Sequence, residues 1–149
     1  MRKFKLLAIG MLLSVHIISQ TDVQASVNKE HFNSDRDAKF AVSQIVLYCG
    51  LELNFQIVED YSIKNANTFI KKRLRYVKYN PEFLQRITDS LRTDWAAWSV
   101  LAHELGHHLL GHTLAKKTVS YQHEIEADKF SGFILHQMGA SLTEALICI

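Results

Sequence analysis

Residues 103–112 read His-Glu-Leu-Gly-His-His-Leu-Leu-Gly-His. In a helix, His103 and His107 lie four positions apart, about 40° round the axis and roughly 6 Å along it, so both imidazoles reach the same side. Glu104 lies about 100° from His103, which is too far round for a third ligand but near enough to touch a water on the same ion. The His-Glu-x-x-His pattern therefore predicts a metal-binding helix with a general base at Glu104.

A second stretch, residues 123–128 with the sequence His-Glu-Ile-Glu-Ala-Asp, offers the third ligand that catalytic zinc usually requires. Glu124 follows His107 by 17 positions, and Asp128 lies four positions after Glu124. On one helix, this spacing lets one carboxylate bind metal while the other accepts the spare N–H of a ligand histidine. Glu126, about 200° round from Glu124, is expected to face elsewhere. The sequence thus favours Glu124 as the third ligand.

The two motifs resemble those of the gluzincin metallopeptidases, and within them the family of the CAAX prenyl endopeptidase and the heat-shock membrane peptidase HtpX. That family pairs His-Glu-x-x-His with Glu-x-x-x-Asp, and the resemblance covers about residues 40–140. It implies one zinc ion (Zn2+) per chain and assigns these site residues: zinc ligands His103, His107 and Glu124, general base Glu104, and Asp128 behind the ligands.

Two alternative metal-binding patterns fit the residues less well. The metzincin pattern needs a glycine at position 110 and a histidine at position 113, where the chain has Leu110 and Thr113. His108 and His112 form a second i, i+4 pair, displaced about 140° from the first, but no glutamate follows either of them. We expect this second pair to be buried or paired at the surface rather than to bind catalytic metal.

Larger members of the family are polytopic membrane proteins. In this chain no stretch after residue 25 approaches the ~20 apolar residues of a membrane span. The resemblance is therefore to a stripped-down catalytic domain, and the substrates of the membrane members do not transfer to it. The partner that we expect is a peptide or protein substrate.

Hydrophobic periodicity and turn residues predict an α+β domain. On the first motif helix, one ~80° sector forms a core face, with the members Trp98, Leu101, Leu105 and Leu109. Gly106 would let a neighbouring helix approach closely. The expected elements are a helix over 35–49, strands over 55–58, 66–70 and 74–79, helices over 82–91, from 93–94 onward and over 119–138, and a short helix capped by Ser141. Together they predict a small zincin-like metallopeptidase domain with a short mixed sheet beside two antiparallel metal-binding helices.

In gluzincins an edge strand lies alongside the active-site helix and pairs with extended substrate backbone. We assign this role to one strand, which consists of Leu74, Arg75, Tyr76, Val77, Lys78 and Tyr79. A basic cluster lies on and before that strand, with the members Lys71, Lys72, Arg73, Arg75 and Lys78. Two interpretations stay open: the cluster favours acidic peptides, or it is a solvated edge that charge protects from aggregation.

The first 25 residues have the layout of a secretory signal peptide, with a basic start, an apolar run over 6–18 and a small-residue exit at Ala25. Cleavage there predicts an exported protein, periplasmic or extracellular, whereas an uncleaved segment would anchor the chain to a membrane. Removal of residues 1–25 takes three of the 17 basic and one of the 15 acidic residues, which leaves 14 of each. A net charge near zero argues against a nucleic-acid partner.

Residues 26–34 are polar and are expected to be loose, so the metallopeptidase-like domain spans 35–149. Cys49 and Cys148 form one disulfide in an exported protein, or in the alternative are two buried thiols. The apolar ending after Glu144 fits either a short helix against the core or a truncated product.

The predicted activity is that of a zinc-dependent endopeptidase, in which Glu104 takes a proton from the attacking water and passes it to the leaving amine. The oxyanion needs a further donor, and the candidates near the motifs are Tyr76, Tyr121 and His123. One alternative is a secreted, zinc-containing binding module without turnover, against which Glu104 speaks because a structural site has no use for a base. A second alternative, which the motif does not distinguish, is a zinc amidase acting on small or cell-wall amides.

Overall fold

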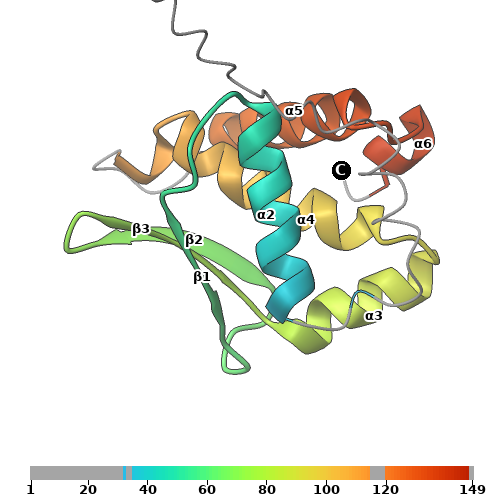
Figure 1. The fold of residues 1–149 in the computed structure, drawn as a ribbon, viewed down its shortest axis with the longest axis horizontal. Coiled ribbons are helices and arrows are strands. Elements are labelled where there is room, and N and C mark those ends of the chain that lie inside the picture. Colours follow the sequence, from blue (N-terminus) through green and yellow to red (C-terminus); the bar gives the residue numbers. More distant parts are fainter. Residues whose placement is uncertain (1–31, 33–34, 115–119, 148–149) are drawn as a thin grey trace, which may run out of the picture.

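The computed structural model describes Phe32 and residues 35–114 and 120–147, which form an α+β domain (Figure 1). In this part of the chain, five α-helices and a short 3-10 helix accompany one three-stranded sheet. The elements are α2 (Asp35–Tyr48), β1 (Phe55–Glu59), β2 (Ala66–Lys71), β3 (Leu74–Tyr79), α3 (Pro81–Leu91), α4 (Trp95–Leu109), η1 (His112–Leu114), α5 (Tyr121–Gln137) and α6 (Leu142–Ala145). The predicted class and the existence of each predicted element are confirmed.

Helix α4, which carries the first motif, forms the centre of the helical layer. Trp98, Leu101 and Leu105 are buried and Leu109 is partly buried against the core, which confirms the predicted core face of this helix. Helices α2, α3 and α5 all pack against α4, and strand β2 lies against it as well (Figure 1). Packing on several sides therefore fixes the direction in which the motif side chains of α4 point.

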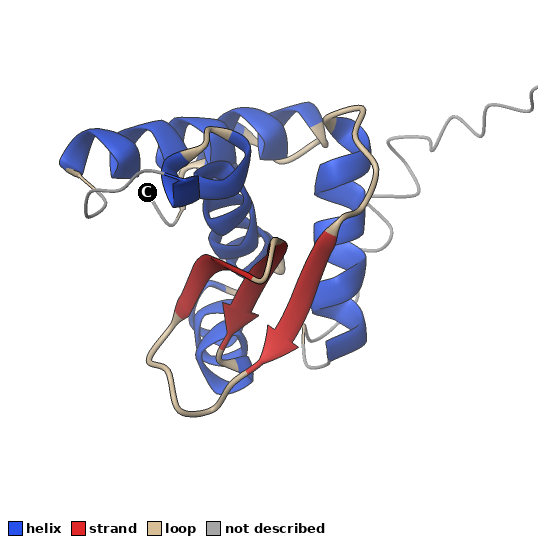
Figure 2. Cartoon of the chain, turned by 90° about the vertical axis from the view of Figure 1, so that its left-hand side faces the viewer, coloured by secondary structure: helices blue, strands red, loops and turns tan. Residues whose placement is uncertain are grey.

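The sheet is mixed, with the strand order β1-β3-β2 (Figure 2). β3 pairs in parallel with β1 and antiparallel with β2, so the backbone groups on both of its edges are used. The prediction that Leu74–Tyr79 is the edge strand beside the active-site helix is therefore wrong. The edge strand that packs against α4 is β2.

Lys78 of β3 did not mark an edge because only the inner face of the sheet is well buried. On that face Val77 and Tyr79 are buried, whereas Leu74 on the outer face is 48% exposed. Lys78 also lies on the outer face, where its ammonium group pairs with Asp60 at 2.8 Å. A central strand of an antiparallel or mixed sheet can carry cations when one of its faces meets solvent.

Local signals set the helix ends near the motifs. Ser120 caps α5, since its Oγ accepts a hydrogen bond from the backbone N–H of His123 at 3.3 Å. Ser141 and Glu144 form the predicted capping box at the start of α6. Helix α4 ends at Leu109, and Gly111, with φ +81°, turns the chain into η1.

Several predictions fall on residues outside the described ones. The signal peptide over 1–25 and Cys148 lie there, so export and the pairing of Cys49 with Cys148 stay predictions. Of the segment 26–34, which was expected to be loose, only Phe32 is described. Phe32 is 4% exposed and its backbone N–H donates to Asp94 Oδ1 at 3.2 Å, so burial of its ring places it in the core instead. Within the described residues, none of the helices combines the length and the apolar character that a membrane crossing needs.

Candidate metal centre

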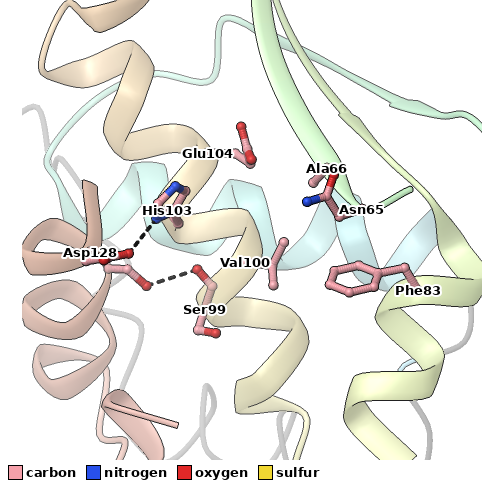
Figure 3. A pocket seen from close by; sticks show the side chains of 9 residues that line it. Asn65, Ala66, Phe83, Ser99, Val100, His103, Glu104 and Asp128 are labelled. Atoms are coloured by element: carbon pink, nitrogen blue, oxygen red, sulfur yellow. Dashed lines mark hydrogen bonds and ion pairs between the residues drawn. The ribbon is translucent and has the colours of Figure 1, made fainter. Parts of the chain in front are cut away.

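Helices α4 and α5 run antiparallel, which brings the two sequence motifs face to face. Ser131 Oγ donates to the backbone oxygen of Ser99 at 2.9 Å, and one turn further along α4, His103 Nδ1 lies 2.8 Å from Asp128 Oδ1 (Figure 3). As the residue number increases along α4, the number of its contact partner on α5 decreases. The predicted antiparallel arrangement of the motif helices is confirmed.

The close approach of the two helices depends on Gly106. A Cβ at this position would lie 3.1 Å from Phe130 Cδ1 and 3.2 Å from Ala127 Cα. The predicted packing role of Gly106 is therefore confirmed. A wider helix separation would draw the carboxylates of α5 away from the imidazoles of α4.

The three predicted ligands converge on one point between the helices. His103 Nε2 and His107 Nε2 lie 3.0 Å apart, and the Glu124 carboxylate oxygens lie 3.3 Å from the first nitrogen and 3.6 Å from the second. Tetrahedral zinc with ligands at ~2.0–2.1 Å separates its ligand atoms by about 3.4 Å. The observed separations bracket that value, so this donor set fits a zinc-sized ion and can hold a metal.

Asp128 orients His103 for this task. Its Oδ1 accepts a hydrogen bond from His103 Nδ1 at 2.8 Å, which fixes the proton on Nδ1 and leaves Nε2 free to bind metal. This contact is the one predicted for Asp128 from its position four residues after Glu124.

His107 is held by a longer chain of contacts that the sequence reasoning missed. Its Nδ1 lies 3.1 Å from His112 Nδ1, and His112 Nε2 lies 3.0 Å from Glu126 Oε2. With His107 Nε2 reserved for the metal, His107 Nδ1–H donates to His112 Nδ1, and His112 Nε2–H donates to Glu126. Gln122 and His112 lower the pKa of Glu126 through hydrogen bonds to its carboxylate, in that order of size.

The expected relation between His108 and His112 as an i, i+4 pair is wrong, because α4 ends at Leu109 and His112 belongs to η1. Gly111 directly before His112 was the available signal, since a glycine with positive φ ends many helices. Both rings are buried, as expected.

His108 ties the helical layer to the sheet. Burial lowers the pKa of His108, which favours the neutral ring. In the neutral ring, Nε2–H donates to the backbone oxygen of Tyr76 at 2.9 Å and Nδ1 accepts from Thr113 Oγ1 at 3.1 Å. Its ring also lies 5.4 Å from the ring centroid of Phe55. These contacts use both nitrogens, which gives His108 a role in packing rather than in metal binding.

Glu104 lies between α4 and the edge strand β2, beside the ligands (Figure 3). Burial raises its pKa from 4.5 to about 7, while the charge of His103 and a hydrogen bond with Thr68 act in the opposite direction. A cation bound next to Glu104 would hold its pKa lower. Glu104 thus lines the same depression as the three candidate ligands without being one of them, and its role as a base stays a prediction.

A continuous groove runs between α4 and β2. Two adjoining depressions share Asn65, Ala66, His103 and Glu104 as lining residues. One extends along α4 to Ser99 and Val100 and reaches Phe83 of α3. The other is lined by the three candidate ligands and extends to Thr68 and Thr113. Within the described residues β2 pairs only with β3, so its other edge faces this groove with unpaired backbone groups.

The groove is not lined by the three predicted oxyanion donors. Tyr76 lies on the outer face of the sheet, where its ring stacks on Phe69 at 4.9 Å, because it alternates with the inward-facing Val77. Tyr121 is 82% exposed, and His123 stacks on His112 at 4.2 Å. The assignment of Tyr76 is therefore wrong, and none of the three is among the described residues that line the groove.

Comparisons with protein-family models, curated proteins and solved structures gave no match for this chain. The geometry alone therefore makes this a candidate metal site, with two imidazoles and one carboxylate around a common point and a further carboxylate beside them.

Proposed function

We propose that this protein is a zinc-dependent endopeptidase of the gluzincin kind, with one zinc ion per chain and a zincin-like domain. The observation that carries the proposal is the convergence of His103, His107 and Glu124 at separations of 3.0–3.6 Å, with Glu104 left over beside them. A structural zinc site would close its fourth position with another protein ligand. Here the fourth side faces a groove.

In the proposed mechanism, His103, His107 and Glu124 hold the zinc ion. When bound, zinc activates water and polarises the scissile carbonyl. Glu104 takes the proton of the attacking water and delivers it to the leaving amine nitrogen. Asp128 and His112 keep the two ligand imidazoles oriented, so that each offers Nε2 to the ion.

The groove supplies a place for the peptide. An extended backbone laid between α4 and β2 would pair with the open edge of β2 and pass directly over Glu104. The strand role first assigned to β3 thus falls to β2, which lies on the correct side of the sheet. We also propose an exported protein, periplasmic or extracellular, whose partner is peptide or protein rather than nucleic acid.

The test pairs zinc content with hydrolysis. Wild type is expected to hold about one zinc per chain and to cut an unfolded protein, whereas Glu104→Gln keeps the zinc and loses activity by a factor of about 10²–10⁴. Glu82→Gln, an exposed change on α3, is the matched control and should behave as wild type.

Each other outcome excludes the proposal in a different way. Zinc without hydrolysis of any substrate indicates a binding module. Hydrolysis of small amides with protein left intact indicates an amidase. Full activity in Glu104→Gln removes the assignment of the base.

A further inference from the structure

The turn between β2 and β3 has an unusual composition. Lys71 pairs with Leu74, so Lys72 and Arg73 alone form the connection, and both have positive φ, 50° and 67°. Two-residue hairpin turns with positive φ at both positions strongly favour Asn-Gly, because most side chains are strained there. Strain of this kind clusters where side chains serve a function. Here the chain keeps two cations in a backbone that suits other residues.

The cations of the cluster divide into two groups. Arg75 lies over the ring of Phe55 at 5.7 Å, and Lys78 pairs with Asp60. Lys71, Lys72 and Arg73 are exposed, and no carboxylate of the described residues pairs with any of them. We call these three residues the cationic tip. Its positive charge is not neutralised within the described part of the chain.

The cationic tip continues the strand that lines the groove. Thr68 of β2 contacts Glu104, and Lys71 follows three residues later, about 10 Å along the strand at ~3.3 Å per residue. The turn projects from the body of the domain at the left of Figure 1. A peptide paired with the open edge of β2, with its scissile bond at Glu104, therefore reaches the tip with residues a few positions away.

Three carboxylates line the groove, those of Glu104, Glu124 and Asp128, and they disfavour acidic side chains beside them. The tip is the part of this strand that carries exposed cations to favour such side chains. A membrane surface is a weaker match for the tip, since the feature that distinguishes the tip is its continuity with β2.

We propose that the cationic tip binds acidic side chains of the substrate peptide, a few residues to one side of the scissile bond. This inference rests on the proposed function and adds the substrate class: peptides with acidic residues flanking the cleavage site.

The experiment measures binding rather than turnover, with the full chain, zinc-loaded and carrying Glu104→Gln. The probe is a fluorescein-labelled peptide with Asp and Glu on both sides of a neutral centre, compared with the same peptide carrying Asn and Gln instead. At low salt the acidic peptide is expected to bind about three- to tenfold more tightly. Rising ionic strength should remove this preference.

The decisive variant is Lys72→Asn/Arg73→Gly, which removes two charges and installs the pair that suits the turn. It should fold at least as stably as the parent and lose most of the preference for the acidic peptide, because Lys71 is then the one cation of the tip that remains. Lys64→Gln/Arg86→Gln removes the same charge elsewhere and should keep the preference.

Equal binding of both peptides by the parent, or an undiminished preference in Lys72→Asn/Arg73→Gly, would overturn the proposal. So would tip-dependent binding of phosphatidylglycerol vesicles without discrimination between the peptides. If the acidic peptide is preferred but the protein with Glu104 intact hydrolyses nothing, the proposed endopeptidase activity is wrong and the proposed role of the cationic tip stands. If the protein hydrolyses peptides but shows no preference for the acidic one, the role of the tip is wrong and the endopeptidase activity stands.

Discussion

Gly106 of α4 lies so close to Ala127 of α5 that a Cβ at position 106 would be 3.2 Å from the Cα of Ala127. Two of the three candidate ligands come from α4 and the third from α5. The separation of the two helices therefore sets the distance between Glu124 and the imidazoles. Because Gly106 has no side chain, the helices can approach closely enough for Glu124 to reach His103 and His107.

Gly106→Ala is expected to lower the free energy of unfolding by about 1–3 kcal/mol, because a backbone atom cannot move aside as a flexible side chain can. It should also weaken zinc binding by shifting Glu124. Urea denaturation of the zinc-free protein and zinc titration measure the two effects separately. Gly106→Val should cost more in both assays. If Gly106→Ala has the unfolding free energy and the zinc affinity of wild type, the packing role of Gly106 is wrong.

His112→Ala and His108→Ala form a matched pair of buried histidine changes with opposite expectations. His112→Ala leaves His107 Nδ1 without its partner and should lower zinc affinity about 10–100-fold. His108→Ala leaves the backbone oxygen of Tyr76 unpaired and should lower stability by about 1–3 kcal/mol while zinc affinity holds. Metal titration and denaturant unfolding of each variant test the pair. Equal loss of zinc affinity in both variants would contradict the separate roles.

Asp128→Asn tests the orientation of His103. The amide oxygen accepts the same hydrogen bond without a negative charge, so zinc affinity is expected to fall within the range of about 10–100-fold. Glu126→Gln should have a smaller effect, because Glu126 reaches the ligands only through His112. Competition with a chromophoric chelator measures both. A larger loss of zinc affinity in Glu126→Gln than in Asp128→Asn would contradict this prediction, because it would make the contact of Glu126 with His112 more important than that of Asp128 with His103.

Asp60 gives a pH-dependent prediction away from the metal. Its pKa is lowered from 3.8 to about 2, first by the hydrogen bond with Lys78 and then by Ser62. A depressed folded-state pKa adds stability above pH 3.8, and this stability is lost as the pH falls toward about 2. Wild type should therefore unfold at higher urea concentration than Asp60→Asn near neutral pH, with the difference shrinking through that interval. A difference that stays constant down to the lowest pH would contradict the contact.

Local spacing was sufficient for much of this protein. The i, i+4 relations of His103 with His107 and of Glu124 with Asp128 depend only on helix geometry, and the structure reproduces both sets of contacts. The capping box of Ser141 depends only on a residue three positions later. The close approach of the two helices at Gly106 depends on the small size of that residue.

Periodicity over a few residues was enough to predict the helices, the candidate ligands and the side of each helix on which they lie. Long-range packing set the remaining features: β2 rather than β3 faces the groove, and His112 and Glu126 support His107. Strand order and the path after Gly111 depend on contacts between segments far apart in the chain. Their free energies come from packing the whole core, and no local pattern encodes them.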